Sequence, residues 1–262
     1  MLGWSINLFR VFGIQLAVHA SFVLLLAYYA YEGWRESGFM GLVVNVAMIL
    51  LFFTCVVLHE LGHSLTAKRY GVNVPRILLL PIGGMAEFDR IPRKPSAELL
   101  ITIAGPAVNF LIFGALAFGL GLPQGFPFHP EIDDSLLGLG QLLLYWNLVM
   151  GTFNLLPVFP MDGGRIFRAL LATQLPYLRA TWWAVRVGQV LAVIFAAVAV
   201  LYFDHLMAGV LFAFIFMAGG TEYRSLLRRE QEAAYWAEMS RRVIEVKAKG
   251  AEPPTLITHG LN

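Results

Sequence analysis

The chain has 262 residues, of which 58% are hydrophobic and only 14% are charged, and its mean hydropathy is +0.68. Soluble domains carry about 25% charged residues, so this composition excludes an ordinary soluble domain and indicates a polytopic membrane protein. The net charge is only +2, and the basic residues follow the predicted membrane topology, so we expect no nucleic-acid partner. The single cysteine, Cys55, cannot form an intrachain disulfide.

The apolar runs predict the helices in chain order. An imperfect alternation over residues 4–9 first predicts a short strand. Six charge-poor runs then predict membrane-spanning helices. They cover residues 12–31, 39–63, 99–122, 135–159, 187–203 and 206–221. Only Asp204 and His205 separate the last two, which predicts a tight helical hairpin.

The basic residues indicate the orientation of these helices. Of the 19 Lys and Arg residues, all but Arg35 fall on one side of the predicted membrane. Because cytoplasmic loops carry the excess of positive charge, the sequence predicts a multi-pass protein of the cell membrane with both termini in the cytosol.

Short surface elements are expected between and after the spans. Residues 72–80 and 85–88 predict two short strands around the turn Pro81-Ile82-Gly83-Gly84. Beyond residue 221, apolar residues at nearly helical spacing predict an amphipathic cytosolic helix, and a solvated helix without a specific role is an equal alternative. We therefore divide the chain into a transmembrane domain, residues 1–225, and a cytosolic helix with a flexible tail, residues 226–262.

The segment His59-Glu60-Leu61-Gly62-His63 carries the strongest chemical signal. It follows residues 37–58, which contain no charge. Residues four apart share a face of a helix, so His59 and His63 can direct their rings at one point. Two such histidines with an adjacent glutamate match the zinc metalloprotease pattern, in which Glu60 activates a water molecule. Ionisable groups next to lipid are costly, which argues against an accidental match.

A catalytic zinc site usually has a third protein ligand, and Asp162 is the best candidate. The second and fourth predicted spans run in the same direction, so Asp162 reaches the depth of His59 and His63. Pro157 and Pro160 interrupt the helix before it. Taken alone, Asp162 could instead cap a helix over residues 163–173.

Several polar or flexible residues near these motifs have two interpretations. Asn154 could orient substrate or stabilise the developing oxyanion, or it could form a packing hydrogen bond. For Asn109 we favour packing. Gly83 and Gly84 could let the backbone of an extended substrate approach the strand that follows them, and an ordinary surface hairpin is the alternative. His19 is expected to be a packing or interfacial group rather than a ligand.

Four motifs carry a family resemblance: HELGH at 59–63, PIGGMAEF at 81–88, AGPAVNF at 104–110 and NLLPVFPMDGG at 154–164. Together, over residues 5–171, they resemble the site-2 protease family of intramembrane zinc metalloproteases, of the peptidase M50 type. The resemblance implies one zinc ion per chain, held by His59, His63 and Asp162, with Glu60 as catalytic base. Only about 40 residues follow residue 221, so we expect no nucleotide-binding CBS modules, and no inserted PDZ domain is expected either.

The sequence thus predicts an all-α polytopic membrane protein with about six transmembrane helices and short β-strands at the membrane surface near the active site. The expected function is hydrolysis of peptide bonds in transmembrane or membrane-anchored proteins. The expected partners are those substrates and the lipid bilayer, with a regulatory membrane protein or a homo-oligomer as further candidates. Two alternatives are a membrane metal transporter, in which His and Asp would carry a moving ion, and an inactive protease-like scaffold.

Overall fold

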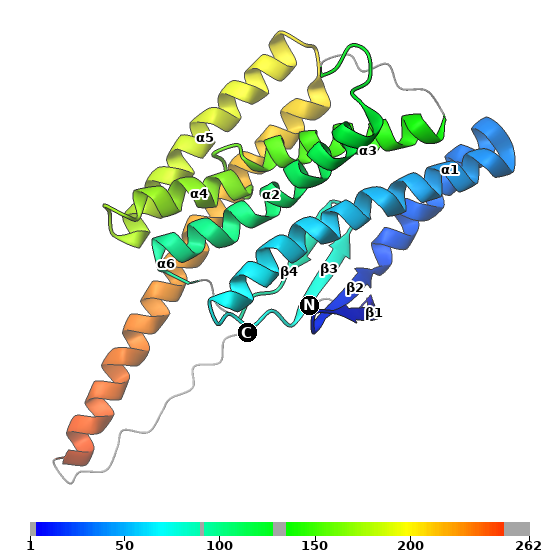
Figure 1. Ribbon diagram of the computed structural model, residues 1–262. Coiled ribbons are helices and arrows are strands. Elements are labelled where there is room, and N and C mark those ends of the chain that lie inside the picture. Colours follow the sequence, from blue (N-terminus) through cyan, green and yellow to red (C-terminus); the bar gives the residue numbers. More distant parts are fainter. Residues whose placement is uncertain (1–3, 90–91, 128–134, 249–262) are drawn as a thin grey trace.

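The computed structural model describes residues 4–89, 92–127 and 135–248. The predicted flexible tail, residues 250–262, lies outside these ranges. Within them the fold is mostly helical with one small sheet (Figure 1). The helices are α1 (Ala20–Arg69), α2 (Pro95–Leu120), α3 (Leu136–Asn154), α4 (Asp162–Leu171), α5 (Tyr177–Leu201) and α6 (Leu206–Ala248).

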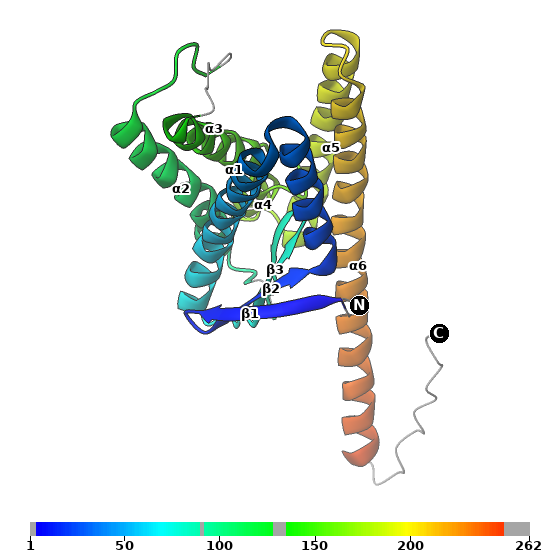
Figure 2. The ribbon, with the colours of Figure 1, turned by 90° about the vertical axis from the view of Figure 1, so that its right-hand side faces the viewer.

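All of these helices except α4 are long and apolar enough to cross a membrane. The first of them, α1, turns back on itself at Ser37 and Gly38, whose backbone angles are not helical. Gly33 and Gly41 lie on either side of this turn, where a side chain on either glycine would overlap the backbone of the other. The two arms of α1 therefore form a hairpin (Figures 1 and 2), which confirms the prediction of two spans in this region.

The four-stranded sheet has the order β1-β2-β3-β4. Its strands are β1 (Ser5–Val11), β2 (Ile14–His19), β3 (Arg76–Leu80) and β4 (Gly83–Ala86). Only the central pair, β2 and β3, is parallel. The prediction of strands at 72–80 and 85–88 is confirmed in outline, with the second strand beginning two residues earlier than expected.

The predicted start of the first span, at residue 12, is wrong. Phe12 and Gly13 form a turn with positive φ, and residues 14–19 form β2 before α1 begins. This segment is apolar because Ile14 and Leu16 are buried in a core formed by the sheet with α1 and α2, and not because it faces lipid. A buried strand and the end of a spanning helix look alike in a short apolar run.

The last two long helices, α5 and α6, pack together as the predicted hairpin. The second of them does not end at residue 221 but continues as one helix to Ala248, and its second half extends beyond the other helices (Figure 2). The proposed domain boundary between residues 225 and 226 falls inside this helix, and the division stays a prediction.

A buried ion pair attaches the short helix α4 to its neighbours. Arg168 of α4 donates to Glu98 of α2 at 2.8 and 2.5 Å and to Glu222 of α6 at 3.0 Å. The side chains of Arg168 and Glu98 are only 2% and 1% exposed. The hydroxyl of Tyr177 also donates to Glu98, at 3.3 Å, and the Arg168 guanidinium lies over the Phe159 ring. These contacts fix α4 against α2 and α6.

We expect Arg168→Ala to destabilise the protein strongly, because it leaves the Glu98 carboxylate buried without its main partner. The expected loss of unfolding free energy is about 3–5 kcal/mol, measured by denaturant unfolding in detergent micelles. Arg242→Ala is the control, since Arg242 pairs with Glu238 on an exposed face of α6 and should change stability by less than about 1 kcal/mol. Equal effects of the two substitutions would contradict this role for Arg168.

Candidate metal centre

Three side chains from two distant segments converge on one point. His59 and His63 lie one helical turn apart on α1, and their Nε2 atoms are 3.1 Å apart. Asp162 is the first residue of α4, and its Oδ2 lies 3.3 Å from His59 Nε2 and 3.1 Å from His63 Nε2. All three residues are buried. The structure thus brings together the three ligands that the sequence predicts, and the carboxylate of Asp162 contacts the histidines instead of capping its helix.

The spacing of these donors fits a zinc ion. In a tetrahedral site with ligand distances of about 2.0–2.1 Å, neighbouring donor atoms lie about 3.3–3.4 Å apart. The observed separations of 3.1–3.3 Å are close to that value. Two imidazoles and one carboxylate are also the protein ligands of several catalytic zinc sites, which keep the fourth position open.

Hydrogen bonds orient the two imidazole rings. Nδ1 of His59 lies 2.5 Å from the side-chain oxygen of Asn109, and Nδ1 of His63 lies 2.8 Å from the backbone oxygen of Ile101. Both partners accept, so both Nδ1 atoms carry the proton and each Nε2 presents its lone pair to the site.

Glycines allow α1 and α2 to approach closely at the site. A Cβ atom at Gly105 of α2 would overlap Nε2 of His63 and lie 2.8 Å from Nε2 of His59. On the facing helix α1, a Cβ at Gly62, the residue before His63, would lie 2.6 Å from the backbone oxygen of Ala104. Small residues permit such contacts between membrane helices. Gly105 therefore supplies the space in which the ligands meet.

Glu60 lies at the boundary between the ligand set and the sheet. Its Oε2 accepts a hydrogen bond of 3.2 Å from the backbone N–H of Ala86 in β4. A Cβ at Gly84 would lie 2.7 Å from the Glu60 Cγ, so Gly84 makes room for this glutamate. Gly83, by contrast, has φ +135° and faces open space at the point where the turn ends and β4 begins. The predicted catalytic base and the predicted strand are therefore direct neighbours.

Three further polar residues singled out in the sequence, Asn154, His19 and Asn109, make contacts of different kinds. Asn154 ends α3, and its amide donates to the Met150 carbonyl at 3.1 Å. His19 caps α1 through a hydrogen bond from Ser21, as its expected packing role suggests. The packing role favoured for Asn109 is incomplete, because this residue contacts His59 directly. The only feature of the sequence that pointed to a contact between Asn109 and His59 is that Asn109 is polar and lies one helical turn after Gly105.

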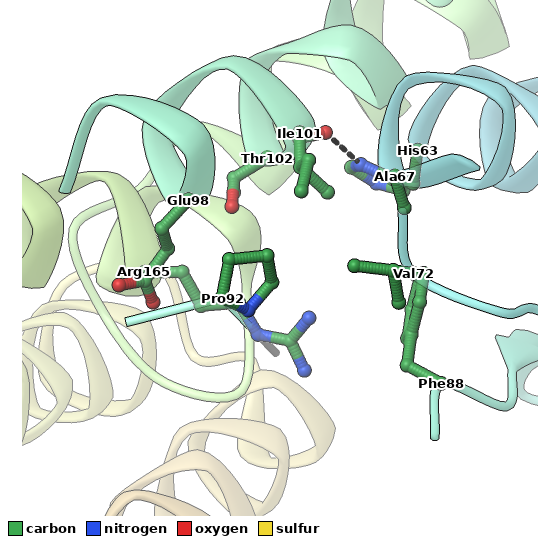
Figure 3. Close-up of a pocket in the computed structure, with 9 residues that line it drawn as sticks. All are labelled: His63, Ala67, Val72, Phe88, Pro92, Glu98, Ile101, Thr102 and Arg165. Carbon is green, nitrogen blue, oxygen red and sulfur yellow. Dashed lines mark hydrogen bonds between the residues drawn. The ribbon is translucent and has the colours of Figure 1, made fainter. Parts of the chain in front are cut away.

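A small cavity opens beside His63 (Figure 3). Glu98 and Thr102 from α2 and Arg165 from α4 line it, together with apolar residues that follow α1 and β4. Two buried atoms, Oε2 of Glu98 and Nε of Arg165, have no hydrogen-bond partner among the described residues. Buried polar atoms of this kind are commonly satisfied by water, so the lining favours solvent next to the ligand set.

The fold and the site define a class: a multi-pass membrane protein with an HExxH helix, a distant aspartate and a small sheet beside the glutamate, as in zinc metalloproteases of the site-2 type. The profile of peptidase family M50 matches residues 47–136 and 130–195, which together cover more than half of the chain. The chain belongs to this family.

Individual relatives agree with this assignment. The zinc metalloprotease MJ0392 of Methanocaldococcus jannaschii is 42% identical over 193 residues, which are 74% of this chain and 53% of the relative. Stage IV sporulation protein FB of Bacillus subtilis is 29% identical over 149 residues, 56% of this chain and 48% of the relative. The chain spans about half the length of these curated relatives. The solved structure of the site-2 protease from Methanocaldococcus jannaschii superimposes with a TM-score of 0.57 and 36% identity, covering 84% of this chain and 95% of that one.

We expect Gly105→Ala to weaken zinc binding at least tenfold, because the added methyl group occupies the space of the two Nε2 atoms. Gly114→Ala is the matched control, since Gly114 lies on the same helix and a Cβ atom added there would meet nothing within 4 Å. Zinc affinity can be measured in detergent by competition with a chromophoric chelator. If both variants bind zinc as the wild type does, Gly105 does not define the site.

Proposed function

We propose that this protein is an intramembrane zinc metalloendopeptidase that hydrolyses peptide bonds of transmembrane or membrane-anchored proteins. The observation that carries the proposal is the convergence of His59, His63 and Asp162 within 3.3 Å of one another beside Glu60. Family membership and the match to a solved site-2 protease support it.

The residues have distinct roles in this proposal. His59, His63 and Asp162 hold one zinc ion, which supplies the Lewis acidity that polarises the scissile carbonyl and acidifies a water molecule. Glu60 takes a proton from the attacking water and gives it to the leaving amine, so that one water and one peptide bond become a carboxylate and an amine. The hydrogen bond from the Ala86 N–H holds the Glu60 carboxylate in position for both transfers.

The strand beside Glu60 is the proposed binding site for substrate. A peptide bond inside a helix is shielded by the helix itself, so a transmembrane substrate must unwind before it is cut. Within the described chain β4 pairs with β3 alone, and its other edge can accept an extended segment as an added strand. Gly83 leaves the approach to this edge open, and Asn154 is a further candidate contact.

The proposal also includes a route for water to the site and an orientation of the chain in the membrane. The cavity beside His63, with the unpartnered atoms of Glu98 and Arg165, offers water a polar route towards the ligand set. We further propose that both termini lie in the cytosol, which the distribution of Lys and Arg supports. The sheet, which includes the N-terminal strand β1, and the extension of α6 then lie on the cytosolic side, where a regulatory membrane protein or a second copy could bind.

We expect Glu60→Gln to bind zinc normally and to lose proteolysis by about 10²–10⁴-fold, the range of general acid–base catalysis. Fragments of membrane proteins are compared by mass spectrometry after expression of each variant, and zinc content is measured on the purified proteins. Glu36→Gln is the control, because Glu36 is exposed on the other arm of α1. Undiminished cleavage by Glu60→Gln would exclude Glu60 as the base.

Pairing of substrate with β4 is tested by cross-linking. Met85 is 42% exposed on β4. Met85→Cys in the Glu60→Gln background should therefore form disulfides with single cysteines placed near the cleavage position of a substrate, which the fragment comparison identifies. Met207→Cys, at a position 79% exposed on α6, should form none. Equal cross-linking at both positions, or none at Met85→Cys, would contradict binding at this edge.

A further inference from the structure

A chain of buried hydrogen bonds leads from His59 to a backbone carbonyl on a third helix. Nδ1 of His59 donates to Asn109 Oδ1 at 2.5 Å, and Asn109 Nδ2 donates to Asn147 Oδ1 at 3.0 Å. Asn147 Nδ2 then donates to the Leu143 carbonyl at 2.8 Å and to Cys55 Sγ at 3.3 Å. Asn109 and Asn147 are 0% and 1% exposed. The chain connects α1, α2 and α3.

The last link of this chain dictates the direction of all the others. A backbone carbonyl can only accept a hydrogen bond, so Asn147 must present its nitrogen to Leu143. Its oxygen then faces Asn109, which must present its own nitrogen in return. The oxygen of Asn109 is therefore left for His59, and only a proton on Nδ1 of His59 satisfies it. A carbonyl three links away thus selects the tautomer with a free lone pair on Nε2.

The two histidines differ in how this tautomer is fixed. Nδ1 of His63 donates directly to a backbone carbonyl, that of Ile101, and no side-chain substitution removes that acceptor. Nδ1 of His59 depends on two side chains in series. The orientation of one ligand is therefore set by residues of α2 and α3 that lie outside the ligand set.

We propose that Asn109 and Asn147 are positioning residues that hold His59 in its metal-binding tautomer, with Asn147 acting only through Asn109. The inference rests on the proposed function in one respect, that His59 binds zinc. It gives α3, which contributes no ligand, a defined part in metal binding.

The test is a double-mutant cycle on zinc affinity, measured by chelator competition in the full-length protein in detergent. Asn109→Leu removes the acceptor of His59 and should weaken zinc binding about 10–100-fold, as loss of an outer partner of a ligand does. Asn147→Leu should cause a smaller loss. In the Asn109→Leu background the second substitution should change the affinity by less than about twofold, because the pathway is already broken.

Thr181→Val is the matched control. Thr181 is 0% exposed, and its hydroxyl donates to the Tyr177 carbonyl in α5. The substitution therefore removes a buried hydrogen bond that does not belong to the hydrogen-bond chain between His59 and Leu143. It should leave zinc affinity unchanged. Asn147 contacts none of the zinc ligands. Asn147→Leu therefore provides a second variant if Asn109→Leu fails to fold.

The outcomes separate this inference from the proposed function. A wild-type protein that binds no zinc would overturn both. Wild-type zinc binding with unchanged affinity in Asn109→Leu would overturn the inference alone. Additive effects of the two substitutions, or an equal loss in Thr181→Val, would also overturn it, because the asparagines would then act through general packing.

Discussion

The close approach of α1, α2 and α4 is the constraint on which the rest of the structure depends. Figure 1 shows α2 lying between the other two, so it must leave room for the ligands to meet across it. Gly105 provides that room, and α2 also supplies the acceptors for both imidazole rings. At the far end of α4, Arg168 binds Glu98 of α2 and Glu222 of α6. Asp162 is 99 positions from His63 in the sequence. Its helix α4 has ten residues: Asp162, the first, contacts the histidines, and Arg168, nearer the other end, anchors the helix to α2 and α6.

The same packing connects the metal centre to β4, the strand proposed to bind substrate. Glu60 follows His59 in the sequence, so it faces away from the ligand point towards the sheet, where β4 donates to it. This arrangement argues against a metal transporter, which needs polar groups along a path through the membrane. Most buried polar side chains of the described chain belong to the ligand set, to its hydrogen-bond chain or to the Arg168–Glu98 pair. A scaffold without activity would have no need for a glutamate held at this position.

Local sequence patterns predict some features of the fold and the site correctly and do not predict others. His59, Glu60 and His63 could be predicted because helical periodicity alone places the histidines together. Asp162 required the topology of four spans, and the structure confirms its position. The role of Asn109 depends on a contact across 50 positions, which no local pattern reveals. The first span was misplaced because the buried strand β2 is as apolar as a membrane segment. The continuity of α6 was not predicted because the sequence changes from apolar to charged after residue 221, directly after Gly219 and Gly220, which disfavour a helix; the helix nevertheless continues through both glycines.

The central claim is that two imidazoles and one carboxylate hold a single zinc ion. X-ray absorption spectroscopy of the purified full-length protein tests it most directly, together with metal analysis. The account predicts one zinc ion per chain, with two imidazole nitrogens at about 2.0–2.1 Å and oxygen ligands at about 2.0–2.2 Å. It further predicts that the imidazole scattering weakens when His59 is replaced and that the oxygen shell changes when Asp162 is replaced. A zinc-free protein, or a zinc spectrum that is the same in both variants and the wild type, would contradict it.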